Sequence, residues 1–401
     1  MPGFEVLGEE EKQEILGVLE RGVLFRYEFH NERKGVYKVR EFEQAFSHYV
    51  GAKYALAVSS GTAALKVGLA ALGIGPGDEV LTQGFTFVAT WEAILDLGAI
   101  PVFVEVDDTL CMDPQDLLKK IGPNTKAVVP VHMCGAQARI DTIVEIARAN
   151  GLKVLEDTAQ ACGGSLKGKF LGTFGDFGEF SFDSVKTITT GEGGMLVTDD
   201  KGLYTKASQY HDHGHVHDPT LPRGLEGRNF VGFNYRMMEI QGALGLAQLR
   251  KLGFIISRQK ENKLMIKEEL SKISSITFRN ILDEGGDIGS FLIFFLPSQE
   301  EAKWFKKSMD ENKIPNVYWY ENLWHYYKRW EHLLEGKSVI TSGYPFKDSG
   351  GKTRISYDEN ALPQTEHLLS RAITIPININ MEKQLPGILD GIRKIKSQWT
   401  A

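Results

Sequence analysis

Cysteine is scarce in this sequence: only three occur among 401 residues, as Cys111, Cys134 and Cys162. The count is odd and no pair has CxxC spacing, so neither a disulfide framework nor a structural zinc site is indicated. The N-terminal segment MPGFEVLGEEEKQEI also lacks the basic start and the apolar stretch of a secretory signal. We therefore predict a cytoplasmic protein.

Long apolar runs and a basic surplus are also missing. The longest apolar runs, such as Phe291 to Pro297, are too short to cross a bilayer and are typical of buried strands. Lysine and arginine total 46 against 52 acidic residues, a net charge of -6, which gives no general attraction to nucleic acid or anionic lipid. We therefore expect a small-molecule partner, and neither a nucleic-acid nor a membrane partner.

Strand-like and helical patterns alternate between residues 53 and 200. The runs KYALAV, EVLTQ, PVFVEV, TKAVVPV and LKVLE favour strands, whereas TAALKVGLAAL and FVATWEAILDLG favour helices. This alternation predicts an α/β domain with a largely parallel sheet. A charged helix at about 255–273 is expected to link it to a smaller α+β domain. We predict a large domain over residues 1–254 and a small C-terminal domain over residues 255–401.

Three polar segments lie where an α/β sheet can present ligands. The segment SSGTAA at 59–64 sits between a strand and a helix, so its N–H groups could hold a phosphate, or it could only cap the helix. Asp157 ends a buried strand and could bind a metal, a ribose or a cationic ring nitrogen, or cap the next turn. Lys186 precedes a Gly-rich turn. If partly buried, its neutral amine could attack an aldehyde; the alternative is a solvated surface lysine.

In their order and spacing these segments resemble the DegT/StrS family of sugar aminotransferases, and the resemblance covers nearly the whole chain. It implies fold type I of the pyridoxal-phosphate enzymes, with a large, mixed, mostly parallel sheet domain and a smaller α+β C-terminal domain. The matching segments are SSGTAAL at 59–65, GFTFVATWEAI at 84–94, EDTAQACGG at 156–164, FSFDSVKTITTGEGG at 180–194, GFNYRMMEIQGALGLAQL at 232–249 and LPQTEHLLSRAITIPI at 362–377.

The resemblance implies pyridoxal 5'-phosphate as the cofactor and gives two residues catalytic roles. Lys186 would bind the cofactor covalently and move protons during amino transfer, and Asp157 would pair with the pyridine nitrogen. Asn234 would reach the phosphate in the neighbouring subunit, which predicts a homodimer with shared active sites. The other implied cofactor contacts are Gly61, Thr62 and Ser181 at the phosphate, Phe87 against one ring face and Gln160 near the phenolic oxygen.

Several segments are similar to one branch of the family, the 8-amino-3,8-dideoxy-manno-octulosonate aminotransferases of lipopolysaccharide biosynthesis. These segments include HMCG at 132–135, FDSVKTIT, HDHGHVHD and YWYENLWHYY. The branch implies amino transfer from glutamate to C8 of an acidic eight-carbon sugar. Arg26, His132 and His213 are the substrate residues predicted with it, and Arg26 would read the sugar carboxylate unless it belongs to a solvated basic loop. The alternatives are a nucleotide-linked 3- or 4-keto-hexose aminotransferase and a non-catalytic pyridoxal-phosphate-binding regulator.

Four histidines occur at every second position from His211 to His217. On an extended segment they could gather a metal ion. The resemblance implies instead that Asp212, His213 and Gly214 belong to an active-site loop without metal, so we predict no metal site. An aromatic patch over residues 318–327 lacks a basic surround and is expected to be core or pocket wall, not a base-stacking surface.

Overall fold

Seven strands form one sheet at the centre of the computed structural model, which describes residues 3–348 and 350–399. Their order is β1-β9-β8-β5-β4-β2-β3. Strands β3, β2, β4, β5 and β8 run parallel, and β9 is antiparallel to both of its neighbours. This confirms the predicted large, mixed and mostly parallel sheet. The strands are β1 Tyr54–Val58, β2 Glu79–Gln83, β3 Ile100–Val104, β4 Thr125–Val129, β5 Lys153–Asp157, β8 Phe177–Ser181 and β9 Gly194–Thr198.

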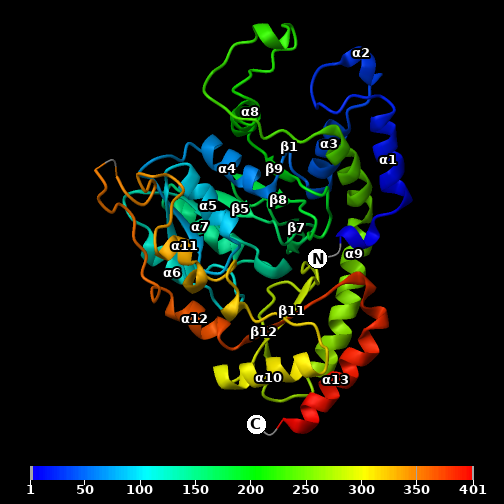
Figure 1. Cartoon of the computed structure of the whole chain (residues 1–401), viewed down its shortest axis with the longest axis vertical. Helices are drawn as coiled ribbons and strands as arrows, with labels where there is room; N and C mark the ends of the chain where they lie inside the picture. Colours follow the sequence, from blue (N-terminus) through cyan, green and yellow to red (C-terminus); the bar gives the residue numbers. More distant parts are fainter. Residues whose placement is uncertain (1–2, 349, 400–401) are drawn as a thin grey trace.

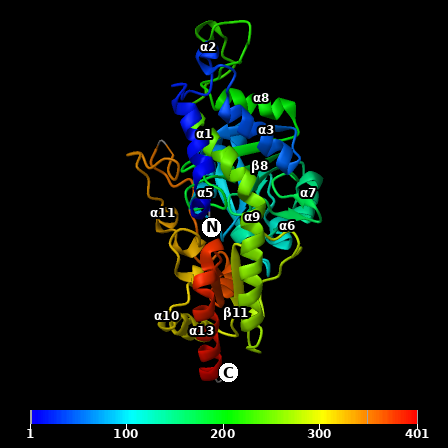
Figure 2. The same cartoon turned by 90° about the vertical axis from the view of Figure 1, so that its right-hand side faces the viewer.

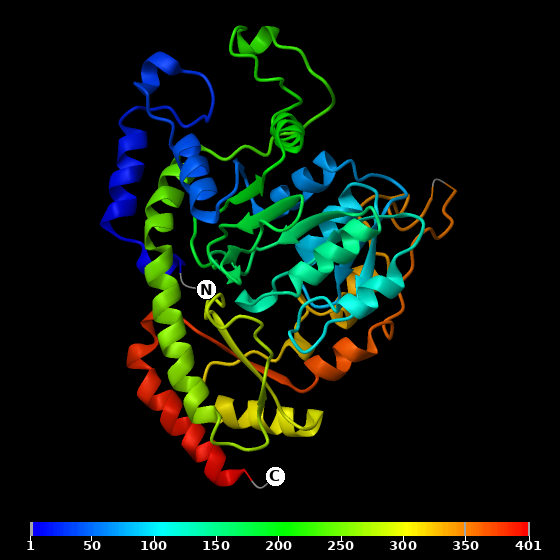
Figure 3. The ribbon, with the colours of Figure 1, turned by 180° about the vertical axis from the view of Figure 1, so that it is seen from behind.

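Helices cover both faces of this sheet (Figure 3). Along β4, Ala127 and Val129 belong to the core under α4, α5 and α8, whereas Val128 between them packs toward α6 and α7. Such alternation follows from the two-residue period of a strand, and burial of both faces explains the near-continuous apolar runs in the sequence. The helices are α4 Gly61–Ala71, α5 Val88–Asp96, α6 Pro114–Lys120, α7 Ile140–Ala149 and α8 Lys201–Tyr210.

A smaller antiparallel sheet lies at the C-terminal end of the molecule (Figure 1). It pairs β10 Thr277–Phe278, β11 Phe291–Phe295 and β12 Ala372–Pro376, and it packs against α10 Gln299–Glu311 and α13 Leu385–Gln398. The apolar run from Phe291 to Pro297 therefore contains a buried strand, as the sequence predicted.

One helix, α9 Glu239–Leu270, runs through the predicted domain boundary at residue 254 without a break. In Figure 2 it passes beside α1 Glu9–Leu19 and α3 Lys38–Val50 at one end and beside α13 at the other. Residues 317–362 lie in sequence between β11 and β12 of the small sheet, yet Trp319, Tyr327 and Trp330 pack into the core of the large domain. Most of the predicted aromatic patch is thus buried core, as expected, but Trp324 is 64% exposed.

Short elements complete the connections. They are α2 His30–Arg33, α11 Glu331–Leu334, α12 Pro363–Leu369, the β6–β7 hairpin of Ser165–Leu166 and Lys169–Phe170, and 3-10 turns such as η2 Met133–Gly135. None of the helices within residues 3–348 and 350–399 has the length and hydropathy of a membrane span.

Candidate active site

A cavity of about 90 Å³ lies where the carboxyl ends of β2, β4 and β5 meet the start of α4. Ligand sites in open α/β sheets occur at this edge because the loops leaving parallel strands converge there. The cavity brings together all the predicted cofactor residues except Asn234. They are Gly61, Thr62, Phe87, Asp157, Gln160, Ser181 and Lys186.

The start of α4 faces this cavity. Ser60 caps the helix by accepting a 3.0 Å hydrogen bond from the Ala63 N–H, so the capping interpretation holds for this residue. The N–H groups of Gly61 and Thr62 belong to the first helical turn, where the helix itself offers no acceptor. With the hydroxyls of Thr62 and Ser181 on the same cavity wall, they form a site suited to a phosphate.

Asp157 ends β5 and is 4% exposed. Its Oδ2 atom accepts a 2.8 Å hydrogen bond from the Thr90 hydroxyl, and its Oδ1 atom accepts a 3.2 Å bond from the Ala159 N–H. The second bond caps the following turn, as one interpretation of the sequence allowed. Both donors stabilise the ionised carboxylate, so Asp157 can also hold a cationic ring nitrogen.

Lys186 lies in a turn after β8 and is half-buried, not fully solvated. Its N–H donates to the Asp183 carbonyl at 3.0 Å and its carbonyl accepts from the Gly3 N–H at 2.9 Å, so the main chain around it is fixed. Within the described residues, the Lys186 amine has no ion pair with a carboxylate. It therefore faces the cavity as an available amine.

Aromatic rings from the C-terminal part of the chain pack against Phe87, which lines the cavity. Phe87 precedes α5, and its ring lies 5.3 Å from that of His325 and 6.2 Å from that of Trp324. Burial and the nearby charge of Lys186 lower the pKa of His325 to about 3, so this imidazole is neutral. Gln160 lines the same cavity as Phe87. Its Oε1 atom accepts from the Cys134 N–H at 3.0 Å, which identifies the other end of the amide, Nε2, as the donor.

The three predicted substrate residues lie outside this cavity, as does Asn234, which was predicted to reach the neighbouring subunit. His132 is fully buried; its Nδ1 atom accepts from the Ala138 N–H at 3.1 Å, so its Nε2 atom donates to Glu156. His213 and Asn234 are exposed on the segment between α8 and α9. Their substrate and cofactor roles stay predictions.

Arg26 lines a second, larger cavity of about 990 Å³, away from Lys186. Its guanidinium donates to Glu43 Oε1 at 2.7 Å and to the Ala57 carbonyl at 2.8 Å. Its role as a reader of carboxylates stays a prediction, and the basic loop around it is not simply solvated. We place the chemistry in the smaller cavity because that one holds the amine of Lys186 and the carboxylate of Asp157.

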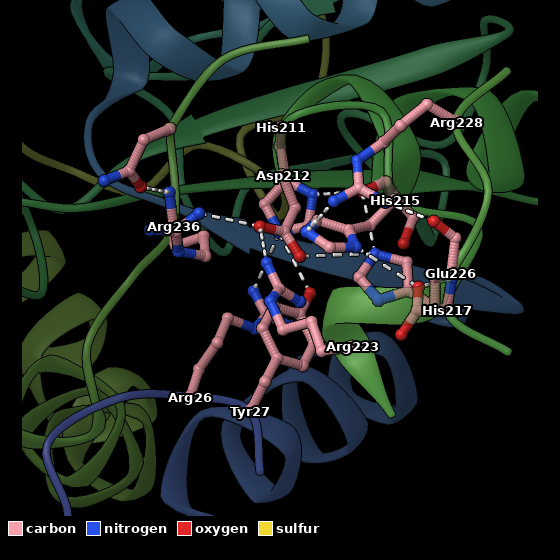
Figure 4. Close-up of polar contacts among 12 residues, drawn as sticks. Arg26, Tyr27, His211, Asp212, His215, His217, Arg223, Glu226, Arg228 and Arg236 are labelled. Carbon is pink, nitrogen blue, oxygen red and sulfur yellow. Dashed lines mark hydrogen bonds and ion pairs between the residues drawn. The ribbon is translucent and has the colours of Figure 1, made fainter. Parts of the chain in front are cut away.

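The four alternate histidines do not converge on one point. Figure 4 shows His217 beside Asp212, whereas His215 contacts Glu226. His211 is fully buried beside Arg26, and burial followed by this charge lowers its pKa well below the usual value. Among the residues that the structure describes, no three His, Cys, Asp or Glu side chains are placed to hold a metal ion.

Three residues of the site were missed by the sequence reasoning. Thr90 reaches Asp157 from α5, and His325 comes from a segment far along the chain. Neither carries a local signal, because each acts only through the fold. Glu179 had one: it lies two residues before Ser181 on a strand, so both side chains must share a face.

Comparison with known proteins agrees with this geometry. Residues 7–342 match the DegT/DnrJ/EryC1/StrS aminotransferase family. The spore coat polysaccharide biosynthesis protein SpsC of Bacillus subtilis is 40% identical over 286 residues, which covers 70% of this chain and 71% of that protein. GDP-perosamine synthase of Escherichia coli O157:H7 is 42% identical over 245 residues, which covers 61% of this chain and 65%, just under two thirds, of that protein.

A solved structure extends the similarity to the full length of the chain. The aminotransferase from Psychrobacter cryohalolentis covers 98% of both chains with a TM-score of 0.84 and 25% identity. Pyridoxal phosphate, the cofactor of this class of enzyme, fits this cavity. It would meet the amine of Lys186, the buried carboxylate of Asp157 and the N–H groups at the start of α4. The chain belongs to the DegT/DnrJ/EryC1/StrS family of aminotransferases.

Proposed function

We propose that the protein transfers an amino group from glutamate to an aldehyde or keto carbon of a sugar. One observation carries this proposal: Lys186, Asp157 and the start of α4 line a single cavity. Relatives named for polysaccharide and perosamine biosynthesis support a sugar as the acceptor. Because the catalytic amine and its partner acid are both present, a purely regulatory role is not favoured.

The residues divide the work by their chemistry. Pyridoxal phosphate supplies an aldehyde that carries the amino group and a ring that accepts electrons. Lys186 would hold the cofactor and then, with its amine freed, move a proton at the substrate carbon. Asp157 would keep a positive charge on the ring nitrogen, and the N–H groups of Gly61 and Thr62 would bind the phosphate.

For the acceptor, we propose C8 of a 3-deoxy-octulosonate, as in lipopolysaccharide biosynthesis. Support comes from the segments HMCG at 132–135, FDSVKTIT and HDHGHVHD, which resemble that branch of the family. A nucleotide-linked 3- or 4-keto-hexose is the second candidate. It is favoured by the 42% identity to a GDP-perosamine synthase.

We further propose that the active protein is a homodimer. Asn234 is exposed and does not line the cavity of its own subunit. Its neighbours Val231 and Phe233 are 80% and 46% exposed, an apolar surface that a second subunit could cover. In that arrangement Asn234 would complete the phosphate site of the partner.

A substrate screen tests the proposed function. The purified protein with bound cofactor is incubated with glutamate and either the octulosonate aldehyde or a GDP- or TDP-linked keto-hexose, and release of 2-oxoglutarate is measured. We expect turnover with the octulosonate and none with the Lys186→Ala control. Faster turnover with a nucleotide sugar would establish the second candidate instead, and no turnover with any sugar would refute both.

A further inference from the structure

Glu179 is a second acid beside Asp157 that the chemistry above does not use. The two residues are paired across the parallel strands β5 and β8, so their side chains point to the same face of the sheet. Glu179 is fully buried, and both acids line the cofactor cavity. Two neighbouring carboxylates in a buried site repel each other when both are ionised, so one of them favours its protonated form.

Hydrogen bonding decides which acid holds the proton. Asp157 accepts from the Thr90 hydroxyl and from the Ala159 N–H, and both bonds favour its ionised form. Neither carboxyl oxygen of Glu179 has a well-formed hydrogen bond to any residue within 3–348 and 350–399. Burial and Asp157 raise the pKa of Glu179 by more than the nearby Ala159 N–H lowers it. A protonated Glu179 can itself donate to Asp157.

The surrounding charges agree with this assignment. Burial and then the charge of Asp157 raise the pKa of Glu179 well above its usual value, and Lys186 only partly opposes them. The first turn of α4, which packs on Glu179, brings the uncharged residues Gly61 and Thr62. The titratable groups around Glu179 are Asp157, Lys186 and the Cys162 thiol, with Asp183 and Glu192 farther along the same cavity.

We propose that Glu179 is protonated at neutral pH, donates its proton toward Asp157, and so leaves one carboxylate instead of two beneath the cofactor. It is a positioning residue, because it acts through Asp157. Its function in catalysis rests on the assignment of Asp157 to the cofactor ring. The protonation of Glu179 does not depend on that assignment, and it can be measured without a substrate.

The neutral state of Glu179 also matters at the phosphate site. A methyl group added at Gly61 would lie 2.7 Å from Glu179 Oε1 and 2.8 Å from Ser181 Cβ, so Glu179 lies directly beneath the helix start that faces the cavity. An ionised acid there would repel a bound phosphate, whereas a neutral acid would not. The glycine at position 61 is required because no side chain fits between the helix and these two residues.

Infrared difference spectroscopy on the full-length protein with bound cofactor tests the protonation directly. At pH 7.5 we expect a protonated-carboxyl band that is lost in Glu179→Gln and retained in Glu192→Gln, whose acid lines the same cavity but is exposed. In Asp157→Asn the band should titrate at a lower pH, since the neighbouring negative charge is gone. A spectrum unchanged by Glu179→Gln would overturn the proposal.

Thermal unfolding gives an independent readout. Above the ordinary pKa of a glutamate the unfolded chain has released the proton that folded Glu179 still holds, so the unmodified protein loses stability as pH rises toward the folded pKa. Glu179→Gln has no such proton, so its stability does not fall with pH for this reason. We expect its melting temperature to exceed that of the unmodified protein by about 3 °C or more at pH 8, with the difference closing toward pH 5. Curves that stay parallel from pH 5 to pH 8 would refute the shared proton, whatever the sugar screen shows.

Discussion

Thr90 on α5 donates its hydroxyl hydrogen to the Oδ2 atom of Asp157 on β5 across 2.8 Å. Both side chains are buried, and the Thr86 hydroxyl lies 2.7 Å from that of Thr90. With Thr90 donating to Asp157, Thr86 must donate to Thr90. This chain of hydroxyls fixes the carboxylate in the orientation that a ring nitrogen in the cavity would meet.

Replacing Thr90 tests this orientation. Thr90→Val keeps the shape and removes the donor, and a hydrogen bond to a charged group contributes about 1.5 to 3 kcal/mol. We expect turnover to fall roughly tenfold to a hundredfold and cofactor affinity to weaken. Thr86→Val, which leaves the direct bond to Asp157 intact, should cost less. Equal effects of the two changes would show that Asp157 does not depend on Thr90.

The sheet could be predicted from local pattern, but the pairs within the site could not. Strands such as Tyr54–Val58 and Ile100–Val104 are apolar runs of the length that a buried sheet requires. Thr90 and Asp157 are 67 residues apart, and no periodicity links them. Glu179 could have been predicted from its spacing to Ser181 once the latter was assigned to the cavity.

The predicted domain boundary at residue 254 lies within a continuous helix. A charged helix was expected from about residue 255, yet α9 already begins at Glu239 and runs to Leu270, packing against α1 and α3 along one part and against α13 along another. Trp319 and Trp330 return to the large domain between β11 and β12 of the small sheet. Such a return depends on long-range packing, which a local sequence pattern does not reveal.

Asp212 holds the segment that carries His213 and Asn234. Its Oδ1 atom accepts hydrogen bonds from Arg223 and, at 2.7 Å, from Arg236, and the carboxylate is fully buried (Figure 4). Burial opposes ionisation, but the hydrogen bond and charge of Arg223 hold the pKa of Asp212 well below its usual value.

Asp212→Asn should therefore loosen this segment. Removing one partner of a buried ion pair costs about 3 to 5 kcal/mol. We expect a lower melting temperature and faster proteolysis within residues 216–231. Because the folded pKa is depressed, this stabilisation is present above the ordinary pKa of an aspartate and lost as the pH falls below it. Asp218→Asn, whose acid bonds only to Thr220 in the described chain, is the control. Equal proteolysis of the two variants would contradict the role of Asp212.

Replacing Arg26 shows whether this residue stabilises the fold or binds the substrate. It pairs with buried Glu43 at 2.7 Å, so Arg26→Ala leaves a carboxylate without its cation. We expect about 3 to 5 kcal/mol of destabilisation, measured by denaturant unfolding. Rapid mixing of each half-reaction then shows whether the loss is general. A loss of rate confined to the half-reaction with the acidic sugar, with unchanged stability, would instead show that Arg26 binds the sugar carboxylate.

Mixed dimers test whether Asn234 serves the partner subunit. Asn234→Ala should weaken cofactor binding roughly tenfold, because it removes a hydrogen bond to a charged phosphate. Lys186→Ala should abolish turnover. If the sites are shared, a hybrid of the two variants contains one site with both Lys186 and Asn234 intact, so mixing should restore activity. Mixing without any gain would show that each site is built from one chain.

The central claim is that Lys186 is the amine that binds the cofactor, and it is tested most directly by borohydride reduction followed by peptide mapping. Reduction fixes the pyridoxyl group to the lysine that holds it. We predict a single modified peptide that contains Lys186, and loss of this modification in Lys186→Ala. A pyridoxyl group on another lysine of the native protein, with Lys186 unmodified, would contradict the account.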